Sequence, residues 1–426
     1  MVDLAPPLEK YTAHGEHGAL EEFRLSSHFQ PIFSLAHRRP VGYEGLIRAI
    51  DSRGRNVRPY ELFSKALQGE ARIRLDRQCR AVHVRNFKAL GNARSWLFLN
   101  VDPQVATEGA RFGAFFAEML ESNGFPAHRV AVELIETPFE DEARLAGAVE
   151  YYRSLGCLTV IDDFGAGYSN FDRIWRLRPD IVKIDREMTR RVTVEPLARR
   201  MFTGIISVLH EAGALVCVEG VETEGEALCA TEANADLLQG NYFAAPALRP
   251  PAERASNELF TRLFAEFREE TVEFRNRRRI RLQPYIAALS DAVFALSAGA
   301  DRASAVRALL GLECTERCYL VAADGSQIGA SAESERSAAA RDSRLTPIRP
   351  VTGTNWQTKP FFRRAIDAPG KVQITRPYLS ATGPRLCVTL SYAMSLNGSY
   401  HVLCVDLDFA ALAGKDLAFG LARAEE

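Results

Sequence analysis

The sequence lacks three features that would tie the chain to a membrane or to nucleic acid. It has no run of about 18 apolar residues, the length that a membrane-spanning helix needs, because Asp291 interrupts the nearest candidate at residues 285–300. The first residues lack the charged-then-apolar pattern of a signal peptide. The formal net charge is only −1, so no overall charge attracts nucleic acid or an anionic membrane. We therefore expect a cytoplasmic protein with no membrane span and no nucleic-acid partner.

Cysteine pairs with zinc-site spacing are also absent. No Cys-x-x-Cys occurs, and Cys314 and Cys318 have no second Cys or His pair that would complete a ligand set. Cys217, Cys387 and Cys404 lie in apolar strand-like runs, where a free thiol behaves as a small hydrophobic group. The cysteines are therefore predicted to be structural, which suits a reducing compartment.

The chain does contain enough apolar material for large cores. Of its 426 residues, 47% are hydrophobic and 25% charged, a balance typical of globular proteins, and the length suits two or three domains. The pattern along the chain predicts four segments: a polar lead-in at 1–20, a barrel at 21–250, a charged linker helix at 251–298 and a smaller α+β domain at 299–420.

Within residues 21–250, apolar strand-like runs alternate with segments of helical periodicity. Predicted strands lie at 29–33, 41–48, 96–101, 130–136, 158–163, 180–185, 215–219 and 236–240, and predicted helices at 60–89, 110–123, 140–155, 171–177, 196–212 and 224–234. Repeated strand–helix units favour a parallel sheet. Their number fits a TIM-like (β/α)8 barrel better than an open sheet.

Two adjacent carboxylates, Asp162 and Asp163, end one of these strands and precede a turn with Gly165 and Gly167. Neighbouring side chains of a strand point to opposite faces, so both carboxylates can reach one site only where the strand ends and curls. They would repel each other there unless cations lay between them, which indicates a metal site. A strand that is capped by an ordinary turn is the alternative.

Further polar residues lie in or at the ends of the apolar strands. The full set is Glu44, Asn100, Glu133, Asp162, Asp163, Lys183, Glu219 and Gln239. Isolated charges in a barrel core would be strongly destabilising, so we expect these side chains to converge at the carboxyl-end mouth. Hard oxygen ligands without His or Cys favour Mg²⁺ or Mn²⁺ over zinc.

Eight ordered motifs carry a family resemblance. They are Gln30-Pro-Ile, Glu44-Gly-Leu46-Ile-Arg48, Phe98-Leu-Asn100, Glu133-Leu-Ile-Glu136, Asp162-Asp163-Phe-Gly-Ala-Gly-Tyr-Ser, Val182-Lys183-Ile-Asp185, Glu219-Gly-Val-Glu222-Thr and Gln239-Gly-Asn-Tyr-Phe. Over roughly residues 20–250 the chain resembles the EAL-domain cyclic-di-GMP phosphodiesterases. The resemblance implies a modified TIM barrel whose first strand is antiparallel, and hydrolysis of cyclic-di-GMP to linear 5′-pGpG.

The resemblance also implies a role for each residue. Two ions, Mg²⁺ or Mn²⁺, would be held by Glu44, Asn100, Glu133 and Asp162 at the first site and by Asp162 and Asp163 at the second, with Glu219 at the second metal or the water. Lys183 would orient or deprotonate the attacking water, so the expected catalytic set is Lys183, Glu219 and Glu44. The expected substrate contacts are Gln30, Leu46, Arg48 and Gln239, and the residues expected to hold the loop after Asp163 are Glu136 and Glu222.

Some of these residues have simpler explanations. Lys183 could merely pair with a neighbouring aspartate, and Arg48 could be a structural partner of Glu44. Tyr242 and Phe243 suit stacking on guanine and packing in the core equally well.

The chain departs from the family pattern at three places. Gly45 replaces the signature alanine, Ala49-Ile50 replaces a common aromatic residue after the arginine, and Ala166 stands where threonine is frequent. None of these changes removes a carboxylate. We therefore predict an active enzyme, with a rate that the changes could lower.

The C-terminal part has a weaker resemblance, to PAS/Cache-like sensory domains. It rests on Phe361-Phe-Arg-Arg-Ala, Thr375-Arg-Pro-Tyr-Leu-Ser380 and the run 401–408. Strands are expected at 317–323, 372–378, 385–392 and 400–406, with a hairpin at Asn397-Gly398 and a mobile polar loop at 330–344. A plain dimerisation domain is the alternative, and the linker helix is either a spacer or a dimerisation seam.

Three functions follow as hypotheses. The first is a cyclic-di-GMP phosphodiesterase, expected as a homodimer, that an unknown small-molecule or protein signal regulates through the second domain. The second is a cyclic-di-GMP receptor without turnover that signals through the linker helix; the intact carboxylate set disfavours it. The third is another barrel enzyme, such as an aldolase or glycosidase, which leaves the ordered motifs unexplained.

Overall fold

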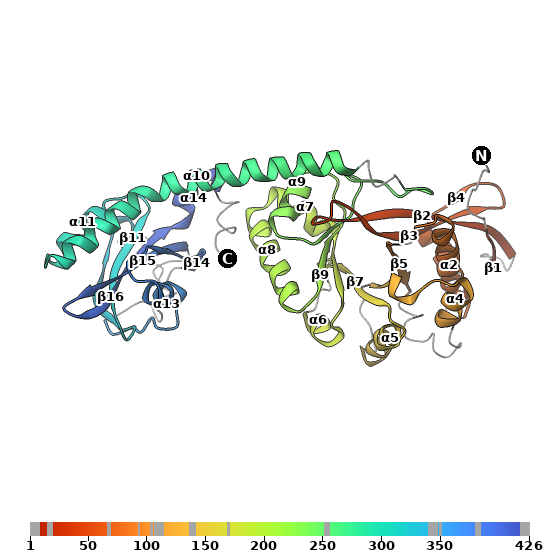
Figure 1. Ribbon diagram of the computed structural model, residues 1–426, viewed down its shortest axis with the longest axis horizontal. Helices are drawn as coiled ribbons and strands as arrows, with labels where there is room; N and C mark the ends of the chain where they lie inside the picture. Colours follow the sequence, from red (N-terminus) through yellow and green to blue (C-terminus); the bar gives the residue numbers. More distant parts are fainter. Residues whose placement is uncertain are drawn as a thin grey trace. The chain divides into compact units, whose positions relative to one another are not determined.

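The structure is a computed structural model of the chain (Figure 1), and it describes residues 9–14, 20–65, 70–92, 94–102, 105, 115–135, 142–167, 171–250, 256–339, 348, 352–379 and 385–417. The chain divides into two compact units, Met1–Phe267 and Arg268–Glu426. Each unit has its own hydrophobic cores.

The first unit is built on a closed eight-stranded barrel. Its strands are β2 (Leu20–Ser34), β3 (Arg39–Asp51), β5 (Trp96–Val101), β6 (Val130–Ile135), β7 (Leu158–Phe164), β8 (Ile181–Ile184), β9 (Leu215–Val218) and β10 (Leu237–Leu238). Strand β2 is antiparallel to both of its barrel neighbours, β3 and β10, whereas the remaining neighbours are parallel. This confirms the predicted TIM-like barrel with an antiparallel first strand.

Helices surround these strands in Figure 1, with α2 beside β5, α4 beside α2, and α8 beside β9. Their bounds are α1 (Pro59–Lys65), α2 (Glu70–Ala89), α4 (Phe115–Asn123), α5 (Glu142–Ser154), α6 (Phe171–Leu177), α7 (Arg186–Val194), α8 (Pro196–Glu211) and α9 (Glu224–Glu232), with a short 3-10 turn at Ala127–Arg129. The single helix predicted at 60–89 is assigned as two helices. Helix α7 was not predicted; it begins after Asp185, whose carboxylate accepts from the Glu187 N–H as an N-cap.

Two further strands extend the barrel sheet. Strand β1 (Glu9–His14) pairs with β2, and β4 (Asn56–Val57) pairs with β3. Strand β1 lies in the segment that was expected to be a loose lead-in, and it is an added edge strand outside the closed barrel. Helix α10 (Ser256–Ser297) lies within the segment expected as a linker helix, and its Phe260 and Leu263 pack into the core of the first unit.

The second unit is an antiparallel sheet covered on both faces. Its strands are β11 (Thr315–Ala322), β12 (Gln327–Glu333), β13 (Gln373–Ile374), β14 (Tyr378–Leu379), β15 (Leu386–Leu396) and β16 (Ser399–Asp408). Alternate residues of β11 point to opposite faces. Cys318 and Leu320 pack with residues 282–293 of α10 and with α11 (Arg302–Leu310), while Tyr319 and Val321 pack with α13 (Pro360–Asp367). Helix α14 (Phe409–Leu417) follows β16.

Two sequence predictions in this unit were wrong in detail. The loop expected at 330–344 begins as the end of β12 and continues as helix α12 (Glu335–Ala339); residues 340–344 lie outside the described residues. The strand expected at 372–378 is divided into β13 and β14. The hairpin at Asn397-Gly398 is confirmed, with both residues at positive φ (51° and 83°), as a type I′ turn requires.

No helix in the described part of the chain is long and apolar enough to cross a bilayer.

Candidate active site

The polar residues of the barrel form one layer of its interior. An apolar layer lies below them: Ile32, Phe98, Ala131, Val160, Ile181, Cys217 and Leu237 pack together as one buried cluster. Side chains repeat every two residues along a strand, so the next interior position on each parallel strand lies two residues further on. Those positions are Asn100, Glu133, Asp162, Lys183, Glu219 and Gln239, while Gln30 precedes Ile32 by two because β2 runs the other way. The strand period therefore brings these residues to the carboxyl-end mouth.

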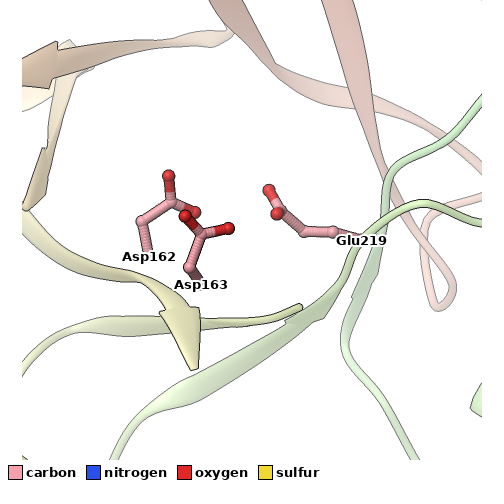
Figure 2. Close-up of side chains that lie close together, drawn as sticks. All are labelled: Asp162, Asp163 and Glu219. Atoms are coloured by element: carbon pink, nitrogen blue, oxygen red, sulfur yellow. The ribbon is translucent and has the colours of Figure 1, made fainter. Parts of the chain in front are cut away.

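A local distortion of β7 lets both adjacent aspartates reach this layer. The β7–β8 register shifts between Ile161 and Phe164, and Asp163 adopts a left-handed conformation with φ 56°. The carboxylates of Asp162 and Asp163 then lie on the same side, and Glu219 at the end of β9 points toward them (Figure 2). One oxygen from each of the three residues lies within 4.8 Å of the others.

Lys183 lies at the centre of the carboxylates. Its ammonium Nζ is 2.6 Å from Glu133 Oε1, 3.2 Å from Asp162 Oδ1 and 3.6 Å from Glu44 Oε2, and it also pairs with Glu219 Oε1. The side chain is only 1% exposed. The alternative that Lys183 merely pairs with one aspartate does not describe this environment, because four carboxylates share it.

Two amides fix the carboxylate of Glu44. Asn100 Nδ2 donates to Glu44 Oε1 at 2.8 Å, and Gln239 Nε2 donates to Glu44 Oε2 at 2.6 Å. Gln239 Nε2 also lies 3.3 Å from Gln30 Oε1, and Gln30 Nε2 donates to the Ala244 carbonyl. Four predicted site residues from β2, β3, β5 and the end of β10 are thereby linked in one network.

Burial dominates the electrostatics of the carboxylates. It raises the pKa of Glu133, Glu219 and Asp162 above their ordinary values, although the Lys183 ammonium opposes the shift. Burial, followed by the charge of Asp162, raises the pKa of Asp163 to about 6. Holding these groups together as anions therefore requires more positive charge than one lysine supplies.

The pKa values of Glu44 and Lys183 shift in the directions that favour the charged forms of both side chains. Burial alone would raise the pKa of Glu44, but the Lys183 charge and the hydrogen bonds from Gln239 and Asn100 lower it. Burial alone would lower the pKa of Lys183, but the surrounding carboxylates raise it well above its ordinary value. Lys183 is therefore held as an ammonium among the carboxylates.

The donor set fits divalent cations that prefer oxygen. Within the described residues, Glu133 Oε2 is buried and has no hydrogen-bond partner. Asp162, Asp163 and Glu219 bring oxygens close together, and although Lys183 pairs with Asp162 and Glu219, Asp163 forms no ion pair with a described residue. Carboxylates that are crowded in this way, without a sulfur or imidazole donor in the group, suit Mg²⁺, Mn²⁺ or Ca²⁺.

Comparison with known proteins agrees with this geometry. The EAL domain family matches residues 17–246, which is more than half of the chain. The chain belongs to the EAL-domain family. Its relatives include the EAL-domain containing protein YkuI of Bacillus subtilis, 28% identical over 224 residues, and the cyclic di-GMP phosphodiesterase RocR of Pseudomonas aeruginosa, 31% identical over 94 residues.

These relatives match only part of the chain. The YkuI match covers 51% of this chain and 54% of YkuI, and the RocR match covers 22% and 24%, so the chain spans about half or less of the length of these curated relatives. The crystal structure of YkuI, in complex with substrate c-di-GMP and calcium, is similar with a TM-score of 0.76 at 21% identity, covering 92% of this chain and 96% of that chain. At that identity the likeness supports the fold.

The remaining residues expected to contact substrate lie around the EAL-domain mouth. Leu46 is half-buried and lines a cavity of about 290 Å³ together with Asn100. Arg48 is half-buried, and its Nη1 donates to the backbone carbonyl of the preceding residue, Ile47, at 2.9 Å. Burial lowers the pKa of Arg48, and the charge of Glu44 partly offsets the effect. Among the described residues no carboxylate forms an ion pair with Arg48, so the alternative of a direct structural pair with Glu44 has no support.

The structure does not place Glu136 or Glu222, the two residues expected to hold the loop after Asp163, at the site. Glu136 and the loop residues 168–170 lie outside the described residues. Glu222 is exposed, and its backbone N–H donates to Glu226 Oε2 next to the α9 capping box. The role proposed for both glutamates stays a prediction.

The two aromatic residues after Gln239 pack in the fold. Phe243 contacts Phe33 and Phe260, with ring centroids 5.3 Å and 5.4 Å apart. The Tyr242 hydroxyl donates to Glu224 Oε1 at 3.0 Å. These contacts favour the packing alternative over stacking on a base.

A close backbone approach explains the glycine in the Gln239-Gly240 motif. A Cβ at Gly240 would collide with the backbone of Val221, and the Val221 N–H donates to the Gln239 carbonyl at 3.0 Å. The segments that carry Glu219 and Gln239 can therefore lie side by side only with glycine at this position.

Sequence reasoning missed two polar clusters behind the site. Arg72 donates to Asp102 Oδ2 at 2.7 Å, and Asp76 Oδ1 accepts from the Asp102 N–H at 3.1 Å, just after β5. His83 on α2 bonds Ser27 on β2. These residues are separated by 26 to 56 positions in the chain. The helical periodicity of the sequence identifies only the apolar face of α2, so it does not predict these polar contacts.

Proposed function

We propose that this EAL-domain protein hydrolyses cyclic-di-GMP to linear 5′-pGpG with two divalent cations, Mg²⁺ or Mn²⁺. The observation that carries the proposal is the convergence of Glu44, Glu133, Asp162, Asp163 and Glu219 around one lysine at the mouth of the barrel. The name of RocR as a cyclic di-GMP phosphodiesterase and the c-di-GMP bound to YkuI support the choice of substrate.

The residues would divide the work as follows. Glu44, Asn100, Glu133 and Asp162 would hold one ion, and Asp162 and Asp163 the other, with Glu219 beside it. Divalent cations bound there would make a water more acidic and neutralise charge on the phosphodiester.

The rest of the chemistry is positioning by the chain. Lys183, as an ammonium, would orient the attacking water and balance the charge of Glu133 and Glu219. Arg48 presents a planar fork of donors suited to phosphate oxygens. The water oxygen bonds to phosphorus, the bond from phosphorus to the ribose O3′ breaks, and the proton released by the water ends on that O3′.

A single assay tests the proposal. The purified chain is incubated with cyclic-di-GMP and Mg²⁺ or Mn²⁺, and products are separated by chromatography. The proposal expects pGpG that disappears on addition of a chelator. Binding of cyclic-di-GMP without pGpG under either metal would favour the receptor hypothesis, and neither binding nor turnover would favour another barrel enzyme.

Other parts of the account also stay predictions. A PAS/Cache-like role for the second unit is supported by its antiparallel sheet with helices on both faces. All eight cysteines are buried and free of disulfides, which supports a reducing cytoplasm as the location.

A further inference from the structure

Position 45, where the EAL signature has alanine, is tightly confined by His83. A Cβ built on Gly45 would lie 2.8 Å from His83 Cγ, 3.1 Å from its Nδ1 and 3.2 Å from its Cβ. Carbon atoms in proteins pack at about 3.5–4.0 Å. An alanine at position 45 is therefore incompatible with His83 in its present place unless the helix or the strand moves.

The imidazole of His83 cannot give way easily. It is buried, and its Nδ1 lies 2.8 Å from Ser27 Oγ on β2. The same hydroxyl accepts from Asn86 Nδ2 at 3.2 Å, one turn further along α2. On its other side the ring meets Phe29 edge-on, with centroids 6.4 Å apart. Moving the ring would break a buried hydrogen bond and disturb an aromatic contact.

A methyl group at position 45 would therefore displace β3, the strand that carries Glu44. Gly45 faces α2, because it lies between Tyr43 and Ile47, which pack against that helix, while Glu44 and Leu46 face the opposite way. Glu44 accepts hydrogen bonds of 2.8 Å and 2.6 Å, which tolerate little displacement. His83 also lines the cavity of about 290 Å³ that Leu46 and Asn100 line.

We propose that Gly45 and His83 act as a matched pair, in which the imidazole occupies the space of the missing methyl group and sets the position of β3. His83 is then a positioning residue for the metal ligand Glu44, and the glycine is a compensated change that does not weaken the site. This inference rests on the proposed function, because it assigns Glu44 to a metal.

A double-mutant cycle tests the pair. Mn²⁺ affinity is measured by calorimetry, and kcat and KM by pGpG formation, in the wild type, Gly45→Ala, His83→Ala and the double variant. Gly45→Ala alone is expected to weaken Mn²⁺ binding and kcat by about 10–100-fold, the usual effect of disturbing a ligand's support. In the His83→Ala background the same substitution should change either quantity by about twofold at most. Gly147→Ala, on α5 with open space around its Cβ, is the matched control and should change neither.

The outcomes separate the two proposals. An equal effect of Gly45→Ala in both backgrounds, or a loss of Tm with unchanged Mn²⁺ affinity and kcat, would overturn the pair while leaving the proposed function standing. A wild type that binds no Mn²⁺ would reject the proposed function itself. Should Gly45→Ala fail to fold, the double variant decides, because the pair requires it to fold and to bind Mn²⁺ within about twofold of His83→Ala.

Discussion

At the scale of single residues, the site is a cluster of buried carboxylates whose negative charge one ammonium group partly neutralises. Lys183 pairs with four of them, and its side chain is 1% exposed. Removing the ammonium would leave Glu133 and Glu219 without their cation, and the attacking water of the proposed reaction without the group that orients it. Lys183 would thus both orient the water and neutralise the carboxylates.

Lys183→Ala should therefore abolish hydrolysis. We expect turnover to fall by at least about 100-fold, the usual loss when a proton-handling or water-positioning group is removed. The measurement is pGpG formation at saturating Mn²⁺, with circular dichroism to check the fold. Lys88→Ala, at an exposed position on α2, is the control and should retain wild-type turnover. Near-normal turnover in Lys183→Ala would refute the assigned role.

His83 makes a second prediction, on stability. Burial, aided by the charge of Arg48 and opposed by that of Glu44, lowers the pKa of His83 to about 3. The unfolded chain titrates near pH 6.5, so between these values it binds a proton that the folded chain does not. Stability is thus complete above about pH 6.5 and falls as the pH drops, by up to about 1.4 kcal/mol per pH unit from this group.

Urea unfolding at pH 7, 6 and 5 measures this slope. His83→Gln removes the titrating group and keeps a hydrogen-bonding side chain opposite Ser27, so its free energy of unfolding should fall less steeply with pH than that of the wild type. Equal slopes in the two proteins would contradict a neutral buried imidazole.

At the scale of secondary-structure elements, the second unit has a buried ion pair between neighbouring strands. Arg317 on β11 donates from Nε to Asp406 Oδ2 on β16 at 2.7 Å, and Thr389 on β15 donates to Asp406 Oδ1 at 2.6 Å. Both Arg317 and Asp406 are almost fully buried. Breaking such a pair leaves a buried charge without its partner, which costs far more than an exposed pair contributes.

Asp406→Asn should therefore destabilise the second unit by about 3–5 kcal/mol. Trp356, which packs on Tyr319, reports on this sheet once Trp96 and Trp175 are replaced by phenylalanine in the full chain. Its fluorescence transition in urea should move to lower denaturant. The exposed pair of Arg277 and Glu273, which lies in the same unit, provides the control, since Glu273→Gln should shift stability by less than about 1 kcal/mol. An unshifted Trp356 transition in Asp406→Asn would contradict the account.

Strands of the barrel could be predicted because they are short continuous apolar runs, as expected of parallel strands that are buried on both faces. Elements with a weak apolar pattern could not. Helix α7 is short and polar, and its start depends on the Asp185 cap; β1 is a polar edge strand; β12 is rich in small residues and only partly buried. In each case pairing or capping within the folded chain decides the structure, and local composition does not reveal it.

At the scale of the whole molecule, the convergence of the site followed from topology. Once the strands form a closed barrel, residues two positions beyond its apolar layer must meet at the mouth, which made Glu133, Asp162, Lys183 and Glu219 predictable. The dependence of Gly45 on His83 was not, because it arises from a contact between α2 and β3 that no local pattern encodes. For Asp163, the sequence predicted only that the strand ends and curls there, and not the left-handed conformation with φ 56°.

Metal stoichiometry tests the central claim most directly. Calorimetric titration of the metal-free chain with Mn²⁺ should show two ions bound per chain, and Asp163→Asn, which keeps a side chain that tolerates φ 56°, should lose the weaker of the two. A wild type that binds no Mn²⁺, or an Asp163→Asn variant that binds both ions with unchanged affinity, would contradict the account.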